Sequence, residues 1–398
     1  MRIKIFNTTK REISYHYGMF ILILSVIILV SGCNNQKTGG NNTKSNIKGS
    51  RIVLANKVAV YSDHRPAAMY RLNAEDYGIV YKHGDGPDDC DYLGARDVWV
   101  WKYGNTYYMN YDGAGKKAWL ACLAISKDLV HWVPKGPVLH LGGKGTKDCA
   151  SASYGSVYQD GNKWYMYYLG TPHTTPAPYY VPDFPYLTME AESNSPTGPW
   201  IKHYNIIPFM PKPGTYYSGT ASPGFIIKQG SQYLMFFSAS TSNSLSITGK
   251  SKILRTISIA RTTNLQGSWT LDKKPIVPLD EQVENTSIYY EKTNKTYFIF
   301  TNHIGLSNGL EYTDAIWVYW SKDLNNWDPE HKAVVLDTSN CKWSKHIIGL
   351  PSIVQVGNRL AIFYDGNKSP QLPPGVKSHM KRDIGLAWLN LPLIIPSE

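Results

Sequence analysis

Short apolar runs recur along the chain in one form. Each begins with a run of Val, Ile, Tyr or Trp, passes through a turn containing Gly or Asn, and ends in a second run rich in aromatic residues. Five segments share it: Asp97 to Tyr111, Gly155 to Tyr168, Gly224 to Phe237, Thr286 to Phe300, and Ser352 to Tyr364. β-Branched and aromatic residues favour strands, and Gly or Asn supplies the positive φ of tight hairpins. The pattern therefore predicts five β-hairpins.

A polar turn that ends in Trp follows each of the first four hairpins. It reads Ser-Lys-Asp-Leu-Val-His-Trp at 126–132 and Ser-Lys-Asp-Leu-Asn-Asn-Trp at 321–327, with looser versions at 193–200 and 262–269. The hairpins start 58 to 69 residues apart, which suits a four-stranded blade plus a long loop. No segment has a sustained helical period. We therefore predict an all-β chain with a single five-bladed β-propeller of four-stranded blades over residues 51–398.

The fifth blade lacks this turn and stops at Ile384 to Leu391. We expect the run from Arg51 to Tyr61 to supply its missing outer strand and so close the ring. Closure removes exposed sheet edges, which would otherwise template aggregation.

The N-terminal region has a different pattern. A basic start precedes an uninterrupted apolar run from Met19 to Val30, shorter than the roughly 20 residues of a membrane span. This arrangement predicts a signal peptide at residues 1–32; a signal-anchor helix is the alternative. Residues 33–50 are mostly Asn, Gly, Lys, Ser and Thr. They cannot bury a core, so we expect a flexible tether.

The sequence Val30-Ser31-Gly32-Cys33 resembles the lipobox of bacterial lipoproteins. The resemblance implies that Cys33 is lipidated and that the membrane is a partner through this anchor. Asn rather than Asp at position 34 favours the outer membrane by the same resemblance. We expect an exported domain that faces the periplasm or the cell surface, and such a domain does not meet nucleic acid.

The composition is basic, with 41 Lys and Arg against 30 Asp and Glu and a formal charge of +11. A basic domain suits an acidic polysaccharide such as a uronate or sulfated glycan, although lysines on solvated loops account for the same excess. The five cysteines form no CxxC pair and show no zinc-ligand spacing. Cys122 lies in an alternating apolar run and is expected to be a buried free thiol. Export would permit a disulfide among the others.

The hairpins and the Ser-Xaa-Asp-Leu-Xaa-Xaa-Trp motif resemble those of five-bladed glycoside hydrolases, including families 43, 32 and 117. The resemblance covers residues 51–394 and concerns architecture rather than substrate. Ala95-Arg96-Asp97-Val98 is similar to the motif that opens the first blade in these families, with Val98 in place of Pro. The resemblance implies hydrolysis of plant or algal glycans with no cofactor, and leaves room for a structural calcium or sodium ion in the axial channel.

Glycoside hydrolysis uses two carboxyl groups across the glycosidic bond, one ionised and one protonated. Because the innermost strands of a propeller begin at one end of its axis, carboxylates at these starts converge. Asp97 opens blade one, and the resemblance implies that it is the base or nucleophile; a turn-capping Asp is the alternative. Glu284 opens blade four, where family 43 has its general acid; a loop carboxylate paired with a lysine is the alternative. Family 43 has a third carboxylate at blade three, where residues 217–224 contain none, and Asp148 before blade two is the candidate substitute.

Other residues are candidates to contact the substrate. Family 117 uses a His as its acid, so His303 and His346, both near strand ends, are alternatives to Glu284, unless their roles are structural. Arg382 is a candidate to clamp a substrate carboxylate or sulfate. An ion pair with Asp383 that staples the ring closure is the interpretation we favour for it. Arg96, beside Asp97, has the same two interpretations.

Two functions compete. Asp97 and Glu284 at converging strand starts favour an exo-acting glycosidase. The missing carboxylate at blade three favours a non-catalytic glycan-binding lipoprotein. The glycosidase is preferred, largely by analogy of fold. Loop aromatics are candidates to stack on sugar rings in both cases, namely Tyr179, Tyr180, Tyr216 and Tyr217.

Overall fold

The computed structural model describes residues 49–241, 253–308 and 310–397. The expected signal peptide, Cys33 and the expected tether up to residue 48 lie outside these residues. The described part belongs to one compact unit, residues 47–398. It contains strands and three short 3-10 turns, η1 (Pro87–Asp89), η2 (Leu279–Glu281) and η3 (Gly375–His379). No helix among the described residues is long and apolar enough to cross a membrane.

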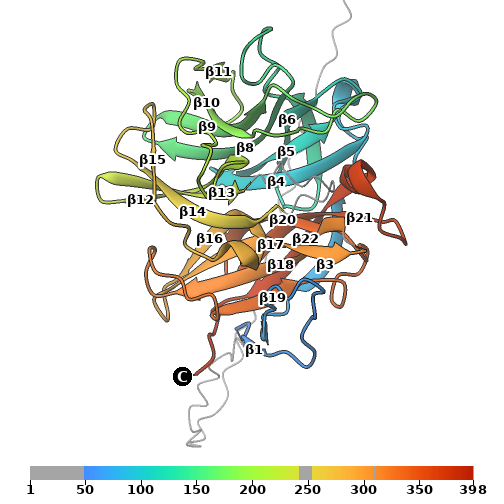
Figure 1. Cartoon of the computed structure of the whole chain (residues 1–398), viewed down its shortest axis with the longest axis vertical. Coiled ribbons are helices and arrows are strands. Elements are labelled where there is room, and N and C mark those ends of the chain that lie inside the picture. The colour runs from blue at the N-terminus through green and yellow to red at the C-terminus, as the bar shows by residue number, and fades with distance from the viewer. Residues whose placement is uncertain (1–48, 242–252, 309, 398) are drawn as a thin grey trace, which may run out of the picture. The chain divides into compact units, whose positions relative to one another are not determined.

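Twenty of the described strands form five antiparallel units of four, here called blades one to five (Figure 1). Blade one is β4 (Gly94–Tyr103), β5 (Thr106–Ala114), β6 (Trp119–Ser126) and β7 (Trp132–Pro137). Blade two is β8 (Ser151–Asp160), β9 (Lys163–Thr171), β10 (Leu187–Ser193) and β11 (Ile201–Lys202). Blade three is β12 (Thr220–Gln229), β13 (Gln232–Ser240), β14 (Arg255–Thr262) and β15 (Thr270–Leu271). Blade four is β16 (Val283–Glu291), β17 (Thr296–Ser307), β18 (Leu310–Ser321) and β19 (Lys332–Leu336). Blade five is β20 (Ile348–Val356), β21 (Arg359–Asn367), β22 (Arg382–Asn390) and β3 (Glu75–Tyr81).

The five first strands surround a common axis. Each of β4, β8, β12 and β16 contacts the first strand of the next blade, and β20 contacts β4 again. Apolar clusters fill all five junctions between neighbouring blades, so large flat side chains hold the ring together. Representative residues, from the junction of blades one and two round to that of five and one, are Trp99 and Met166, Tyr167 and Phe237, Phe236 and Trp317, Phe300 and Ile362, and Phe363 and Val100. The predicted all-β propeller is confirmed.

The turn between the first two strands of each blade has the predicted chemistry. A residue with positive φ occupies the same place in all five turns, and in four of them it is Gly. The residues are Gly104, Gly161, Gly230, Lys295 and Gly357, with φ from 53° to 62°. Gly adopts this conformation without the steric cost of a Cβ atom.

The predicted closing strand is wrong. Blade five is completed by β3, which pairs with β22, whereas the run from Arg51 to Tyr61 contributes only β1 (Val53–Leu54). β1 pairs with β2 (Tyr70–Arg71), and β2 pairs in parallel with β19 at the outside of blade four. Polar contacts hold β3 in place. The buried carboxylate of Asp76 accepts hydrogen bonds from Tyr364 Oη and Lys342 N, both at 2.6 Å.

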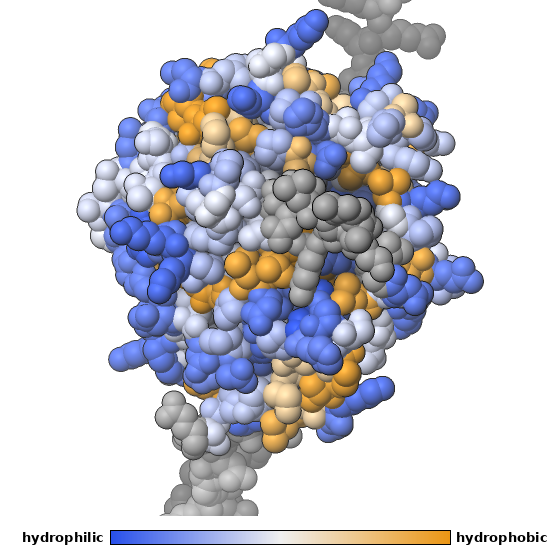
Figure 2. Space-filling model, in the orientation of Figure 1, coloured by the Kyte–Doolittle hydropathy of each residue, from blue (hydrophilic) through white to orange (hydrophobic). Residues whose placement is uncertain are grey.

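Hydrophilic side chains cover most of the face seen in Figure 2, and apolar side chains gather in small patches and in a band near its middle. Inside, Cys122 is a buried free thiol as predicted, and the other described cysteines, Cys90, Cys149 and Cys341, are also free.

Candidate functional site

Every first strand carries a β-bulge near its start. The register shifts fall between Arg96 and Trp99, Ser153 and Gly155, Ser222 and Phe225, Glu284 and Ser287, and Gly349 and Ser352. Four residues within these bulges have positive φ, namely Asp97 (50°), Tyr154 (38°), Asn285 (63°) and Leu350 (21°). Bulges re-aim side chains, and backbone strain in non-glycine residues concentrates at functional sites. The five bulges therefore mark the end of the axis at which a site is expected.

Hydrogen bonds between blades tie the bulges together. Asp97 N donates to Asp365 Oδ2 of the preceding blade at 3.0 Å, and Asn285 N donates to Ser238 Oγ at 2.6 Å. Tyr154 N donates to Asp112 Oδ1 in the same way. Blade three has Pro223 in its bulge, which has no N–H to donate. Asp112 and Asp365 thus align neighbouring blades at the axis.

Asp97 and Asp112 form a carboxyl pair. Burial, the negative charge of Asp97 and a hydrogen bond with Asp97 raise the pKa of Asp112 well above its ordinary value. Two adjacent carboxylates do not both ionise readily, so one proton is shared. Asp112 is 3% exposed, whereas the side chain of Asp97 is 18% exposed and lies 3.1 Å from Arg96 Nη2. The neutral form of Asp112 is therefore favoured in the fold, and Asp97 is the carboxyl group of the pair that a ligand can reach.

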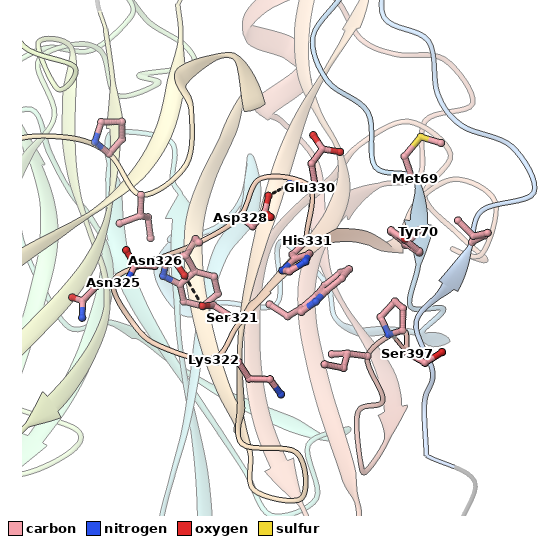
Figure 3. Close-up of a pocket in the computed structure, with 17 residues that line it drawn as sticks. Met69, Tyr70, Ser321, Lys322, Asn325, Asn326, Asp328, Glu330, His331 and Ser397 are labelled. Carbon is pink, nitrogen blue, oxygen red and sulfur yellow. Dashed lines mark hydrogen bonds between the residues drawn. The ribbon is translucent and has the colours of Figure 1, made fainter.

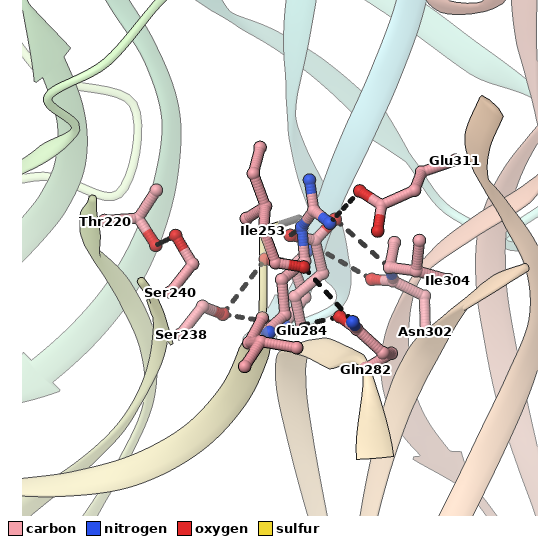
Figure 4. A network of polar contacts seen from close by, with 12 residues as sticks. Thr220, Ser238, Ser240, Ile253, Gln282, Glu284, Asn302, Ile304 and Glu311 are labelled. Carbon is pink, nitrogen blue, oxygen red and sulfur yellow. Dashed lines mark hydrogen bonds and ion pairs between the residues drawn. The ribbon is translucent and has the colours of Figure 1, made fainter. Parts of the chain in front are cut away.

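Glu284 is the other partly exposed carboxylate at these bulges. Its side chain is 30% exposed, and Oε2 lies 3.3 Å from Arg255 Nε. Asn302 Nδ2 donates to Oε1 at 3.4 Å. Arg255 also pairs with Glu311 at 2.6 Å. Glu284, Asn302 and Glu311 belong to the polar network drawn in Figure 4. Glu284 is thus paired, but with an arginine rather than the lysine of the alternative interpretation.

His379 and Tyr186 connect the two carboxylates. Burial and the positive charges of Arg96, Arg382 and Arg255 hold the pKa of His379 well below its ordinary value. Burial raises the pKa of Tyr186, which also feels the charges of Arg96, Glu284 and Arg255. Arg96 and Arg255, the partners of Asp97 and of Glu284, thus both lie near enough for their charges to act on His379 and Tyr186. The region around these six residues is here called the central site.

The tautomer of His379 follows from its contact with Arg96. Arg96 Nη1 donates to His379 Nδ1, and a guanidinium has no lone pair with which to accept a hydrogen bond. His379 is therefore neutral with its proton on Nε2. The guanidinium of Arg96 also lies over the ring of Trp119, 5.4 Å from its centroid.

Arg382 lies deeper and does not pair with Asp383. It is 2% exposed, and Nη1 donates to Asp365 Oδ1 at 2.9 Å. The predicted ion pair between Arg382 and Asp383 is therefore wrong, because Arg382 pairs with the buried Asp365 of the neighbouring strand β21 instead. Asp383 instead lies 2.6 Å from His83 Nδ1. His83 follows β3, so this contact links the two strands that close the ring.

Asp148 does not join the central site. It is fully buried, and its carboxylate pairs with Lys202 at 2.5 Å and accepts from Tyr168 at 2.9 Å and from Thr146 at 2.8 Å. All these partners belong to blade two or the loop before it. The absence of a carboxylate from the blade-three bulge is thus not compensated by Asp148.

The two candidate histidines bond residues other than Asp97, Glu284 and their arginines. His303 is fully buried on β17, with Nδ1 2.8 Å from Asp314 and its ring stacked on Trp317 at 4.0 Å between centroids. His346 lies in the loop before β20, with Nε2 2.9 Å from Pro370 O. Their contacts favour structural roles.

Several residues of the site were missed by the sequence reasoning. Asp112 and Asp365 lie on second strands, each within a Tyr-Asp-Gly triplet, at 111–113 and 364–366. That repeated triplet was the available signal. No sequence signal marked Arg255 or His379, because each follows a long connection whose path places it near the axis.

A pocket of about 950 Å³ lies away from these residues (Figure 3). Its lining comes from the end of β18 and the turn before β19, from Ile395 to Ser397, and from Leu54, Met69, Tyr70, Pro275 and Ile276. The pocket lies at the C-terminal end of β18, beyond Trp320, whereas Glu284 lies level with Asn302 of β17 and Ile316 of β18. The pocket is therefore separate from the central site. Among the described residues, no group of His, Cys, Asp and Glu is placed to hold a metal ion.

No protein family matches the chain by sequence, and no curated protein matches it. Solved structures do resemble it. A glycoside hydrolase is 16% identical with a TM-score of 0.60, covering 81% of this chain and 93% of its own. BT0996, solved as a complex with RGII, is 16% identical with a TM-score of 0.59 and the same coverage. A family 117 glycoside hydrolase of the marine bacterium Zobellia galactanivorans is 15% identical with a TM-score of 0.53, covering 80% and 90%. At such identities the likeness establishes the fold, and the resemblance to five-bladed glycoside hydrolases is confirmed at that level.

Proposed function

We propose that this protein is a glycoside hydrolase in which Asp97 is the base or nucleophile and Glu284 is the general acid. One observation carries the proposal. These two carboxylates are partly exposed, each lies beside an arginine, and the charges of both arginines act on His379 and Tyr186. Paired carboxyl groups across a substrate are the requirement of glycoside hydrolysis. The fold of known glycoside hydrolases and the neighbour in complex with RGII support the proposal.

Asp97 is prepared for its role by Asp112. The proton shared by the pair stays on the buried Asp112, because Asp97 also receives a hydrogen bond from Arg96. An ionised Asp97 then removes a proton from water, or attacks the anomeric carbon directly. The distance between the two catalytic carboxyl groups determines which of these occurs.

Glu284 must carry a proton when the substrate is bound, in order to protonate the leaving oxygen. Protonation would weaken its pairing with Arg255. Because Arg255 is also paired with Glu311 at 2.6 Å, that change leaves no buried arginine without a partner. Closure of the site over a substrate would remove water and favour the neutral acid further.

The alternative is a glycan-binding protein with no catalysis, which the blade-three bulge favours. Its Ser222 and Pro223 provide no third carboxylate. Here the arginines and His379 would bind a sugar, and Glu284 would remain an ion pair.

We also propose that the protein is exported and anchored to the outer membrane through a lipid on Cys33. The lipobox-like sequence before Cys33 supports this proposal.

The test of function is incubation of the purified protein with plant and algal oligosaccharides, both neutral and acidic, followed by detection of new reducing ends. Turnover of at least one substrate, absent from Asp97→Asn, is expected. The substitution retains the size of the side chain, and circular dichroism checks that the fold is intact. Binding of an oligosaccharide with no product after long incubation would instead establish the glycan-binding alternative.

A further inference from the structure

A basic pocket of about 710 Å³ lies beside the central site. Four lysines line it, namely Lys82, Lys368, Lys377 and Lys381, and Asp383 is the one carboxylate in its lining. Asp383 is already engaged, with His83 Nδ1 at 2.6 Å and Lys368 Nζ at 3.6 Å. Within the part of the chain that the structure describes, no carboxylate pairs with the other three lysines. The pocket therefore has excess positive charge.

The pocket and the central site share their walls. The turn η3 carries Lys377 into the pocket and ends at His379, which bonds Arg96. Lys381 directly precedes the buried Arg382. In Figure 1, η3 is the red coil beside β21.

Apolar groups complete the shared wall. Met380 lines the pocket and packs in a buried cluster with Trp119, whose ring lies under Arg96. Tyr179 also lines the pocket, and its carbonyl oxygen accepts a hydrogen bond from Trp119 Nε1 at 2.9 Å. Tyr179 is thus the loop aromatic best placed to contact a sugar, whereas Tyr216 and Tyr217 pack against Phe237 in the core.

We infer that this pocket is a subsite for a negatively charged sugar residue next to the bond that is cleaved. The charge is a uronate carboxylate or a sulfate ester, bound by Lys82, Lys377 and Lys381. Lysine binds such groups as a mobile point charge, and Tyr179 and Met380 offer surface to the apolar face of the ring. The volume lies within the roughly 300–1,000 Å³ of small-ligand pockets. The inference rests on the proposed function only for the position of the cleaved bond.

The test is calorimetric binding of matched oligosaccharide pairs that differ only in charge. One arm compares trigalacturonate with its methyl ester, and the other compares a sulfated galactan oligosaccharide with its desulfated form. All proteins carry Asp97→Asn so that no oligosaccharide is cleaved. They are the otherwise wild-type protein, one with Lys377→Gln and Lys381→Gln, and a control with Lys135→Gln and Lys292→Gln. The control lysines lie outside the pocket, and their substitution removes the same charge.

In one arm at least, the charged form is expected to bind the otherwise wild-type protein about tenfold more tightly than its neutral partner at low salt. The pocket variant should lose most of this preference and the control should keep it. Raising the salt concentration should weaken only the charged form, because exposed lysines are screened.

Equal binding of charged and neutral forms in both arms would overturn the inference, as would a preference that the pocket variant retains. Binding is measured without turnover, so absent hydrolysis would count against the glycosidase and not against the subsite. The arm in which the preference occurs identifies the anion as carboxylate or sulfate.

Discussion

Asp112→Asn removes the proton that Asp112 shares with Asp97. The amide keeps the size of the side chain, its oxygen can still accept from Tyr154 N, and its nitrogen can donate to Asp97. The substitution therefore changes the titration of the pair while the contacts that align blades one and two remain.

The sign of the effect follows from the raised pKa of Asp112 in the folded state. Between the unfolded pKa, about 3.9, and the higher folded pKa, the folded protein binds one proton more than the unfolded chain. The stability that Asp112 contributes is complete at low pH and is lost as the pH rises through the folded pKa. The slope for one proton is about 1.4 kcal/mol per pH unit. The amide has no such slope, so the variant gains stability relative to the wild type as the pH rises above about 4.

The assay is urea unfolding of both proteins at half-unit steps between pH 4 and 8. Asp112→Ala is the control, because it does not titrate either but leaves Tyr154 N unpaired, so it should be less stable than Asp112→Asn by about 1–3 kcal/mol at every pH. Parallel stability curves for wild type and Asp112→Asn would refute the shared proton. A variant that became relatively less stable with rising pH would show that Asp112 is ionised in the fold.

Three further predictions concern ring closure, the axis and the anchor. Asp76→Ala leaves Tyr364 Oη and Lys342 N without an acceptor and should cost about 2–6 kcal/mol in urea unfolding; a loss below about 1 kcal/mol would contradict the role of Asp76 in holding β3. Gly349→Ala places a Cβ atom against Asp365 Oδ1 and should lower the free energy of unfolding by about 1–3 kcal/mol, because it disturbs the pair of Asp365 with Arg382. An unchanged urea midpoint would show that the residues around the axis shift to accept the methyl group without cost. Cys33→Ala should abolish incorporation of labelled palmitate and release the protein from the membrane fraction, and a variant that still fractionates with membranes would favour a signal anchor.

The fold was readable from the sequence because the hairpin pattern and its Gly-containing turns are local. Asp97 and Glu284 were also readable, because each opens a repeat and the propeller brings such positions together. The closing strand was not, since the choice between residues 51–61 and β3 depends on the buried contacts of Asp76. The prediction for Asp148 lacked long-range information in the same way. Its position before blade two does not indicate that Lys202 of β11 pairs with it.

The remaining site residues depend on long-range structure. Arg255 lies on the third strand of blade three, and His379 lies at the end of η3. Each reaches the axis only after the ring has closed. Their function as partners of Glu284 and Arg96 is a property of the assembled blades, and no local pattern marks them.

The central claim is that Asp97 and Glu284 divide the work of base and acid. The most direct test measures hydrolysis of two glycosides of the preferred sugar, one with a sugar as leaving group and one with 2,4-dinitrophenol, by wild type, Asp97→Asn and Glu284→Gln. Dinitrophenolate leaves without a proton, so Glu284→Gln should lose activity by about 100-fold or more on the natural bond and nearly recover it on the aryl glycoside. Asp97→Asn should be inactive on both. Equal losses for Glu284→Gln on the two substrates would contradict its role as the acid.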